Sequence, residues 1–568
     1  MDRKSEQKSF FDTDFVCSGL IPEDSFYNTL YELGPALITD DDFAEMYCHD
    51  NGRKSIPPSI LALTMLLQAH DDLSDRAAAD AVKANIFWKH ALRVSLNYKG
   101  FDYSNLSRFR SKLLVHELEN KPFIKLNQLA SELGLIKAED IHAVDSTAII
   151  GHAELKDTYA LIAEAISKTV NSLLESDEEK AAEELKESRL AAYCEYEKPD
   201  IDWEAEKENR QYLKQLVEDA REVFSFIPDT ISDDKEETLE NYKLLADIIQ
   251  QDIVFKKSDD KNDSDNDNND DDNETDNSEM KPDIKNGVAE DRIISTVDPE
   301  MRHGRKSSSQ RFDGFKGHIT ENLKAEWITN VKVSPANERD CEIGTEIVTE
   351  QKDSTGYIPK KVLADNGYGT SDGRAEYEEE SIELISPVRD KSKNGYYHKY
   401  EFEIDLENME VTCPAGKTTD KAYNSKDSKG RRVKVFHFKK LCDGCSERTK
   451  CTKAKNGRTI TLVYNEELVL KALKQQRENE DFKETYNKRY IIERKIAELF
   501  HHHGMRNTSF FGIKLTELQL FWKATAVNLK RLPKLLANTP EVCLKKAIKV
   551  LKELGSENNG KKAASQAV

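Results

Sequence analysis

The sequence predicts a mixed α/β protein in which a helical domain precedes a central sheet and two insertions interrupt that sheet. Three observations lead to this fold class. Residues before 140 have helical periodicity, short β-branched runs occur at 141–150 and again after 292, and a long acidic, helix-rich stretch separates those runs. The chain has 568 residues, which is more than one hydrophobic core usually organises, so we expect several domains.

Composition excludes two classes of protein. Although 33% of the residues are charged, 22 Phe, 20 Tyr and 4 Trp supply large side chains for real cores, so the chain is not wholly disordered. No apolar run approaches the roughly 18 residues of a membrane span, and the first residues lack a signal-peptide core, so we expect a cytoplasmic protein without a membrane partner. The nine cysteines are an odd number in a chain of this kind, which makes a disulfide framework improbable.

The net charge is divided unevenly along the chain. The total is −21, but residues 151–290 alone carry −24, which leaves +3 for the remainder, and residues 421–568 carry +18. Because local Lys and Arg side chains make phosphate contacts, the C-terminal quarter could bind a polyanion despite the acidic average. A Lys-rich C-terminus without a ligand is the alternative interpretation.

Residues 1–139 are expected to form a helical N-terminal domain. Pro57-Pro58 suits a helix start, Ser74 is a candidate N-cap for a second helix, and a third begins near Ser104. Short helices joined by tight turns fit a helix-turn-helix DNA reader and equally a plain helical bundle, and both interpretations stay open.

The predicted core, 140–395, begins with the strand IHAVDSTAII at 141–150 and is then interrupted by an acidic insertion, 152–290. The insertion is expected to be helical up to about residue 255. Between 259 and 283, twelve acidic residues face two lysines, so we expect that segment to be a flexible loop.

After residue 292 the pattern predicts three strands, a helix, a strand, a helix and a strand. The strands are RIISTVDPEMRH, GFKGHIT, EWITNVKVSP, KKVLAD and SIELISPV, and the first helix is ERDCEIGTEIVTEQ. The chain then continues with a β-rich insert at 396–464, helices at 465–535 and a basic tail at 536–568.

Three acidic residues occupy positions where an α/β fold places catalytic groups. Asp145 interrupts a buried strand, Asp365 ends a strand before a turn, and Glu493 lies in a helix. On that helix Tyr486 and Arg489 share the face of Glu493. Three carboxylates of this kind could hold two Mg²⁺ ions for an in-line phosphoryl transfer, with Arg489 binding a phosphate. Taken singly, each acid is more often a turn former or half of a surface ion pair.

The segments AVDST, ADNGY and Tyr486-x2-Arg489-x3-Glu493 resemble the DDE transposases of bacterial insertion sequences. IPPSILALTMLLQAHDDLSDRAAAD, SNLSRFRSKL and HGRKSSSQRFDGFKGHIT extend the resemblance, which covers roughly 45–150 and 290–535. It implies a ribonuclease H-like core, catalytic Asp145, Asp365 and Glu493, and Mg²⁺ or Mn²⁺ as cofactor. The family often has a lysine seven residues after the catalytic Glu. Position 500 here is Phe, which leaves that role to one of His501 to His503 or to Arg506.

Four cysteines form a separate candidate metal site. Cys442 and Cys445 are spaced as a zinc knuckle, and Cys413 and Cys451 complete a set of four thiolates that resembles the cysteine insert of many of these transposases. His437 is a substitute ligand. A structural zinc and reduced free thiols are the two interpretations.

The resemblance implies that the chain cuts the ends of a mobile element and joins the freed 3′ ends to target DNA. It also implies DNA as partner, both terminal inverted repeats and target, and a homo-oligomer assembled on it. The alternatives are a DNA-binding regulator that has lost cleavage and a ribonuclease H-like nuclease that only hydrolyses. If Glu493 is structural, Glu498 is the nearest substitute acid.

Overall fold

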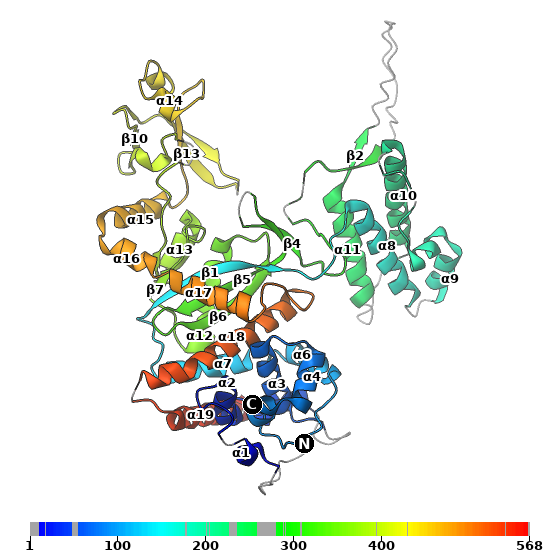
Figure 1. Cartoon of the computed structure of the whole chain (residues 1–568). Coiled ribbons are helices and arrows are strands. Elements are labelled where there is room, and N and C mark those ends of the chain that lie inside the picture. Colours follow the sequence, from blue (N-terminus) through cyan, green and yellow to red (C-terminus); the bar gives the residue numbers. More distant parts are fainter. Residues whose placement is uncertain are drawn as a thin grey trace.

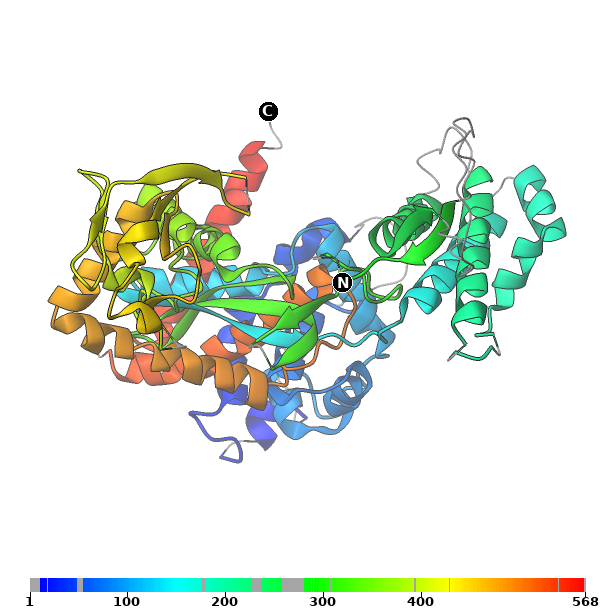
Figure 2. The ribbon, with the colours of Figure 1, turned by 90° about the horizontal axis from the view of Figure 1, so that it is seen from above.

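The computed structural model has a central mixed sheet with helices on both faces and two further units at its opposite ends (Figure 1). Seen from above, the cysteine insert (yellow) and the acidic insertion (teal) again lie at opposite ends of the sheet (Figure 2). The structure describes residues 11–17, 19–47, 55–175, 179–199, 201–203, 205–226, 236–257, 280–287, 289, 291–306, 309–392, 395–428, 430–539 and 541–565.

Strand β1 (Ile141–Ile150) is central in a six-stranded sheet. It pairs antiparallel with β5 (Arg311–Asn322) and parallel with β7 (Lys361–Leu363). The other strands are β6 (Trp327–Pro335) and β4 (Arg302–Arg305), both antiparallel to β5, and β8 (Glu383–Ile385), parallel to β7. The predicted mixed α/β sheet is therefore confirmed.

The first strand predicted after residue 292 is much shorter than expected. Only β4 is a strand there. Ile293 packs in the core of the acidic insertion and Ile294 in the core under the sheet. The apolar run thus marks a junction between two cores, and its burial needs no strand pairing.

Helices cover both faces of the sheet. Helices α12 (Asp340–Thr355) and α13 (Ser371–Glu379) cover one face, where Val144 and Ile347 are buried together. Helices α17 (Tyr490–Ala497) and α18 (Ile513–Ala537) cover the other, where Ile149 and Phe521 share a core. Since alternate strand residues point to opposite faces, Asp145 belongs to the α17 face with Ile149.

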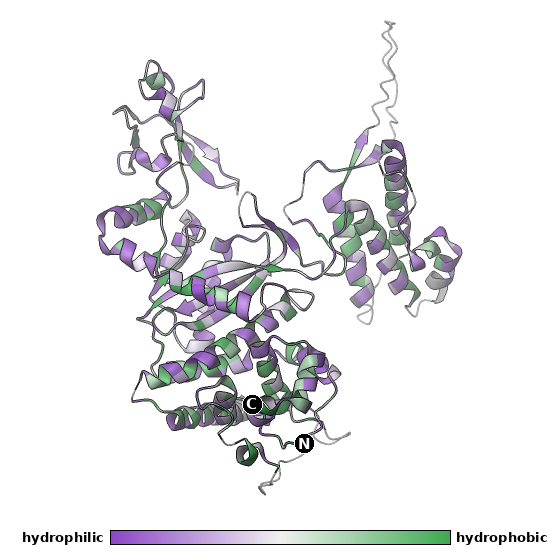
Figure 3. Ribbon diagram, viewed as in Figure 1, coloured by the Kyte–Doolittle hydropathy of each residue, from purple (hydrophilic) through white to green (hydrophobic). Residues whose placement is uncertain are grey.

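The N-terminal domain is helical, as predicted, and Ser74 caps a helix by accepting a hydrogen bond from the backbone N–H of Ala77 at 3.3 Å. Figure 3 shows hydrophobic residues concentrated in its central helix, α3. The elements are α1 (Thr13–Val16), α2 (Phe26–Leu37), η1 (Asp40–Met46), α3 (Pro58–Asp71), α4 (Asp75–Ala84), α5 (Ile86–Ala91), α6 (Ser104–Val115) and α7 (Lys121–Glu132).

The segment expected to be a basic tail contains a packed helix. Helix α19 (Leu544–Ser565) follows α18, and its residues Ala547 and Leu551 are fully buried in the core that α18 shares with the N-terminal helices. Lysines on its exposed side made the segment look like a tail, but its apolar residues recur at i and i+4 and bury one face.

The acidic insertion folds around its own core. Its elements are α8 (Thr158–Leu174), α9 (Glu179–Glu187), η2 (Arg189–Glu195), α10 (Glu206–Ser225), α11 (Glu236–Asp252), β2 (Ile253–Lys257) and β3 (Met280–Ile284). The prediction of a flexible loop over 259–283 was wrong for its last residues, because residues 280–283 pair with β2 in an antiparallel hairpin. Residues 259–279 lie outside the described residues.

The cysteine insert is β-rich, as predicted, with two three-stranded sheets. Its elements are η4 (Lys399–Glu401), β9 (Glu403–Asp405), β10 (Glu410–Thr412), β11 (Thr418–Thr419), β12 (Ala422–Lys426), β13 (Arg432–His437), η5 (Lys439–Cys442), α14 (Arg448–Cys451) and β14 (Thr459–Leu462). Helices α15 (Glu466–Glu478), α16 (Asp481–Asn487) and α17, then η6 (Glu498–His502), lead back to the sheet. Within the described parts of the chain, no helix is long and apolar enough to cross a membrane.

Candidate active site

Asp145 lies in the middle of β1, opposite Ile319 of β5. Asp145 is 9% exposed, and one of its carboxylate oxygens accepts a hydrogen bond from the backbone N–H of Ser146 at 3.0 Å. A strand rich in Ile, Val and Ala buries this position, so the carboxylate loses water and needs a compensating partner.

Asp365 follows β7, the parallel neighbour of β1. Its Oδ1 accepts a hydrogen bond from the backbone N–H of Gly367 at 2.7 Å, which shapes the turn after the strand. Because neighbouring parallel strands end at the same edge of a sheet, Asp365 comes close to the second half of β1. Figure 1 shows β1 and β7 side by side, with α17 across them.

Arg489 links the candidate acids. Its guanidinium donates to Asp145 Oδ2 at 2.6 Å and to Glu493 Oε1 at 2.9 Å. The prediction of one helix carrying Tyr486, Arg489 and Glu493 was wrong in detail: α16 ends at Asn487, and Arg489 is the N-cap residue of α17. The break lies at Lys488, and it leaves Arg489 directed toward the strand.

Tyr486 lies behind this site. Its ring stacks on Phe482 with centroids 6.2 Å apart, and it packs with the apolar residues between α17 and the sheet. Burial raises the pKa of its hydroxyl. Tyr486 does not line the cavity into which the acids point.

The three predicted acids line one cavity of about 480 Å³. Its acidic lining consists of Asp145, Asp340, Asp365 and Glu493. Its basic lining consists of Arg305, Lys306, Lys316, Arg489, His501 and Arg506. A cavity lined by several carboxylates and by basic side chains suits a cation-assisted reaction on a phosphate backbone.

Burial disfavours the ionised form of the Asp145 carboxylate. Loss of water raises its pKa to about 6, although the charge of Arg489 acts in the opposite direction, and the nearby charges of Asp365 and Glu493 raise it further. A divalent cation between these carboxylates would favour their ionised forms. The residues therefore fit a hard cation chemically.

In the described residues no group of three His, Cys, Asp or Glu side chains already stands in a metal-binding arrangement. Among the acids of the cavity, the guanidinium of Arg489 lies between the carboxylates of Asp145 and Glu493 and forms an ion pair with each, so these two carboxylates do not meet around one point.

The remaining candidates, which follow Glu493 in the sequence, lie partly inside and partly outside the cavity. His501 and Arg506 line the cavity, and Arg506 donates to the backbone carbonyl of Ala148 at 3.3 Å. His503 is turned away, with Nδ1 3.3 Å from the backbone carbonyl of Ala69. Glu498 lies outside the cavity, and although burial alone acts upward, Lys495 and Lys530 lower its pKa to about 2.

Sequence reasoning missed Asp340, Lys316, Arg305 and Lys306. Lys316 was detectable in principle, because it interrupts the apolar strand GFKGHIT as Asp145 interrupts its own strand. Asp340 gave no such signal, since an acid in the first turn of a helix is ordinary.

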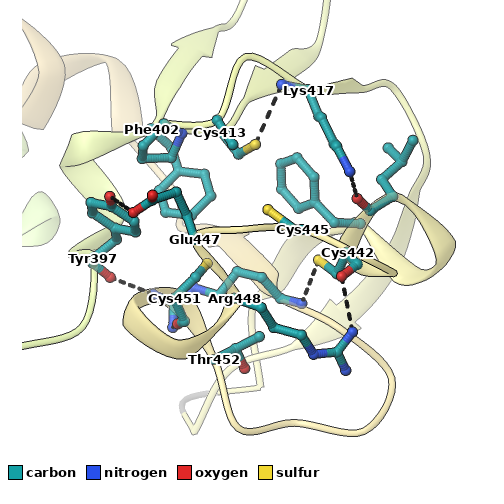
Figure 4. A pocket seen from close by; sticks show the side chains of 15 residues that line it. Tyr397, Phe402, Cys413, Lys417, Cys442, Cys445, Glu447, Arg448, Cys451 and Thr452 are labelled. Carbon is teal, nitrogen blue, oxygen red and sulfur yellow. Dashed lines mark hydrogen bonds between the residues drawn. The ribbon is translucent and has the colours of Figure 1, made fainter.

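The four cysteines predicted as zinc ligands line a second, much smaller cavity of about 20 Å³ (Figure 4). Backbone N–H groups of Lys417 and Arg458 donate to the sulfurs of Cys413 and Cys442 at 3.4 and 3.5 Å. Burial raises the pKa of Cys451, and the other three thiols raise it further. His437 is not part of this lining and stacks on Tyr423.

Comparison with known proteins gives two matches to protein families. Residues 15–112 match the family described as transposase domain (DUF772), and residues 412–533 match the family described as transposase DDE domain. The second match includes the four cysteines of the insert and Glu493 but neither Asp145 nor Asp365. The searches of curated proteins and of solved structures found no significant match. Both family matches are to transposase domains, and together they support a DDE transposase of insertion-sequence type.

Proposed function

We propose that this transposase cleaves DNA at the ends of a mobile element and transfers the freed 3′-hydroxyl ends to target DNA. The observation that carries the proposal is the cavity itself. Asp145, Asp365 and Glu493 come from three distant parts of the chain and line it together with Arg, Lys and His side chains.

The sheet supports a ribonuclease H-like core. Strands β6, β5 and β1 form an antiparallel series, and β7 and β8 continue from β1 in parallel. This order places the first acid on the central strand and the second after its parallel neighbour, and the acidic insertion leaves the core beyond the end of β1.

Asp145, Asp365 and Glu493 would hold Mg²⁺ or Mn²⁺, as hard cations prefer carboxylate oxygens. Bound ions of this kind supply Lewis acids for the attacking and leaving oxygens of a phosphodiester. Arg489 neutralises Asp145 and Glu493 in the absence of DNA, and its planar guanidinium suits a phosphate when DNA is present. Tyr486 supports Arg489 from behind, and Arg506 contributes to the DNA-binding rim.

The proposed reaction has two in-line displacements. Water attacks the phosphorus at the element end, a P–O bond forms, and the P–O3′ bond breaks to leave a 3′-hydroxyl and a 5′-phosphate. That hydroxyl then attacks a target phosphodiester and displaces a target 3′ oxygen, so each P–O bond that breaks is replaced by one that forms.

We also propose a structural zinc in the cysteine insert. The four thiols come from two segments of the insert, Cys413 from one and Cys442, Cys445 and Cys451 from the other, and they line one small cavity. Backbone N–H groups donate to two of the sulfurs, and four thiol sulfurs are a ligand set that structural zinc takes. The insert has a small core, so a bound ion would add folding energy there.

Because the proposed reaction joins two element ends, we expect the protein to assemble as a homo-oligomer on the inverted repeats. Because its substrate would be DNA, we expect it to act in the cytoplasm, at the nucleoid.

A strand-transfer assay tests the proposed function. Purified protein is incubated in Mg²⁺ with a labelled duplex of the terminal inverted repeat and a supercoiled target plasmid. We expect nicks at the repeat end and covalently joined products. Binding without cleavage would favour the inactive regulator, and cleavage without joining would favour a nuclease that only hydrolyses.

A further inference from the structure

Asp340 is a fourth carboxylate in the active-site cavity and comes from an element that contributes none of the other three acids. It is the first residue of α12. Its Oδ1 accepts hydrogen bonds from Ser146 Oγ at 2.9 Å and from Lys316 Nζ at 3.0 Å. Ser146 directly follows Asp145 on β1, so Asp340 is tied to the strand that carries the first candidate catalytic acid.

Lys316 lies on β5 opposite Ala148 of β1. Its Nζ donates to the backbone carbonyl of Glu338 at 2.6 Å as well as to Asp340. An ammonium group has three N–H donors, so two are used by the described residues and one is left. The side chain is 15% exposed and lines the cavity, so the ammonium group can reach a ligand bound there.

The pair lies close to Asp365. A side chain on Gly367 would come within 2.9 Å of Asp365 Oδ1 and within 3.5 Å of Asp340 Oδ2. The two carboxylates therefore border the same small space, which is left open because residue 367 has no side chain. Lys316 is consequently a cation held at the edge of the acidic centre.

Lys332 offers a comparison for Lys316, because it also pairs with α12 but lies outside the cavity. Lys332 lies on the adjacent strand β6 and also pairs with α12, through Glu346 and Glu350. Its exposed fraction, 22%, is similar to that of Lys316, but it does not line the cavity. The helix is thus already tied to the sheet by Lys332, and Lys316 differs from it in facing the acids.

We propose that Lys316 binds a DNA phosphate beside the bond that is cut, and that Asp340 is a positioning residue that holds its ammonium group in place. The proposal rests on the proposed function, since it assigns these residues to the same site. It adds a phosphate-binding group on β5 to the one that Arg489 provides at the start of α17.

Salt dependence of DNA binding tests the role of Lys316. Binding of an inverted-repeat duplex is measured at several salt concentrations without divalent ions, so that no cleavage occurs. Lys316→Met keeps the apolar stem but loses the charge, and we expect the slope of log K against log salt to become shallower by about 0.9, the value for one lost phosphate contact. Lys332→Met is the matched control and should keep the wild-type slope, and Lys316→Arg should largely restore it.

Cleavage in Mg²⁺ tests the role of Asp340. Asp340→Asn keeps Lys316 and its charge, so binding should persist while cleavage falls about tenfold to a hundredfold, because the lysine is no longer fixed. A Lys316→Met slope equal to that of Lys332→Met, in a wild type that cleaves, would overturn the proposal. If Lys316→Met does not fold, the Asp340→Asn variant decides by itself, and cleavage at the wild-type rate in that variant would overturn the proposal. If the wild type itself never cleaves, the proposed function fails, and the salt slopes still report on Lys316.

Discussion

The candidate active-site cavity is lined by residues from distant parts of the chain, whereas the cysteine cavity is lined by residues of the cysteine insert alone. The first has about 480 Å³ of space and is lined by four carboxylates and six basic side chains. The second has about 20 Å³ and is lined by four thiols, by the rings of Phe402 and Phe438 and by a few charged side chains. Catalytic metal sites keep a position open for substrate, and structural sites are closed around the ion. The difference in space between the two cavities is the one expected between the proposed catalytic site and the proposed structural zinc site.

Substitution of Asp365 should have the largest effect. Asp365→Asn removes a proposed anionic ligand, and we expect cleavage of an inverted-repeat duplex in Mg²⁺ to fall by at least about 10²- to 10³-fold, as when a key transition-state contact is lost. The control is Asp353→Asn at an exposed position of α12, which should cleave at the wild-type rate. Equal rates for both variants would place the catalytic acid elsewhere.

Removal of two thiols should affect folding of the cysteine insert and not the chemistry of the core. Cys442→Ser with Cys445→Ser should abolish about one tightly bound zinc per chain, measured by elemental analysis, and should make residues 396–464 sensitive to protease. Cys194→Ser, at an exposed cysteine of the acidic insertion, should change neither. Wild-type protein without zinc under reducing conditions would favour free thiols.

Asp145 should lower the stability of the metal-free protein at neutral pH. Its folded pKa of about 6 exceeds the ordinary 3.8, so its contribution is most favourable below about pH 4 and is lost as the pH rises through about 6. Asp145→Asn should therefore raise the free energy of unfolding by about 1–3 kcal/mol at pH 8 and by little at pH 4. Chemical denaturation at both pH values measures this, and an equal change at both would show that the carboxylate is not strained by burial.

Shortening the acidic segment should have the smallest effect. Lys257 and Met280 pair at the ends of β2 and β3, so deletion of 260–278 leaves residues 258, 259 and 279 to close the hairpin. We expect a change of less than about 1 kcal/mol in stability, because loop closure depends weakly on length. Extending the deletion through Ile284 removes β3 and should destabilise the insertion clearly.

The sequence allowed prediction of elements whose periodicity and caps are local. The strand at 141–150, the helix start at Pro58 and the cap at Ser74 were all confirmed. The helix at α19 was missed because only packing on the N-terminal core shows which of its faces is buried. The pairing of Lys316 with Asp340 was missed because these residues become neighbours only when β5 and the start of α12 meet, and no spacing along the chain records that contact.

Glu493 beside Glu498 gives the most direct test of the central claim, that the cavity is the catalytic site. The two residues are five positions apart, but Glu493 lines the cavity and is held by Arg489, while Glu498 is held by Lys495 and Lys530 outside it. Binding and cleavage of an inverted-repeat duplex in Mg²⁺ are measured for Glu493→Gln and Glu498→Gln. The account predicts that Glu493→Gln binds at least as tightly as the wild type but does not cleave, and that Glu498→Gln still cleaves. Wild-type cleavage by Glu493→Gln, with cleavage lost in Glu498→Gln, would contradict it.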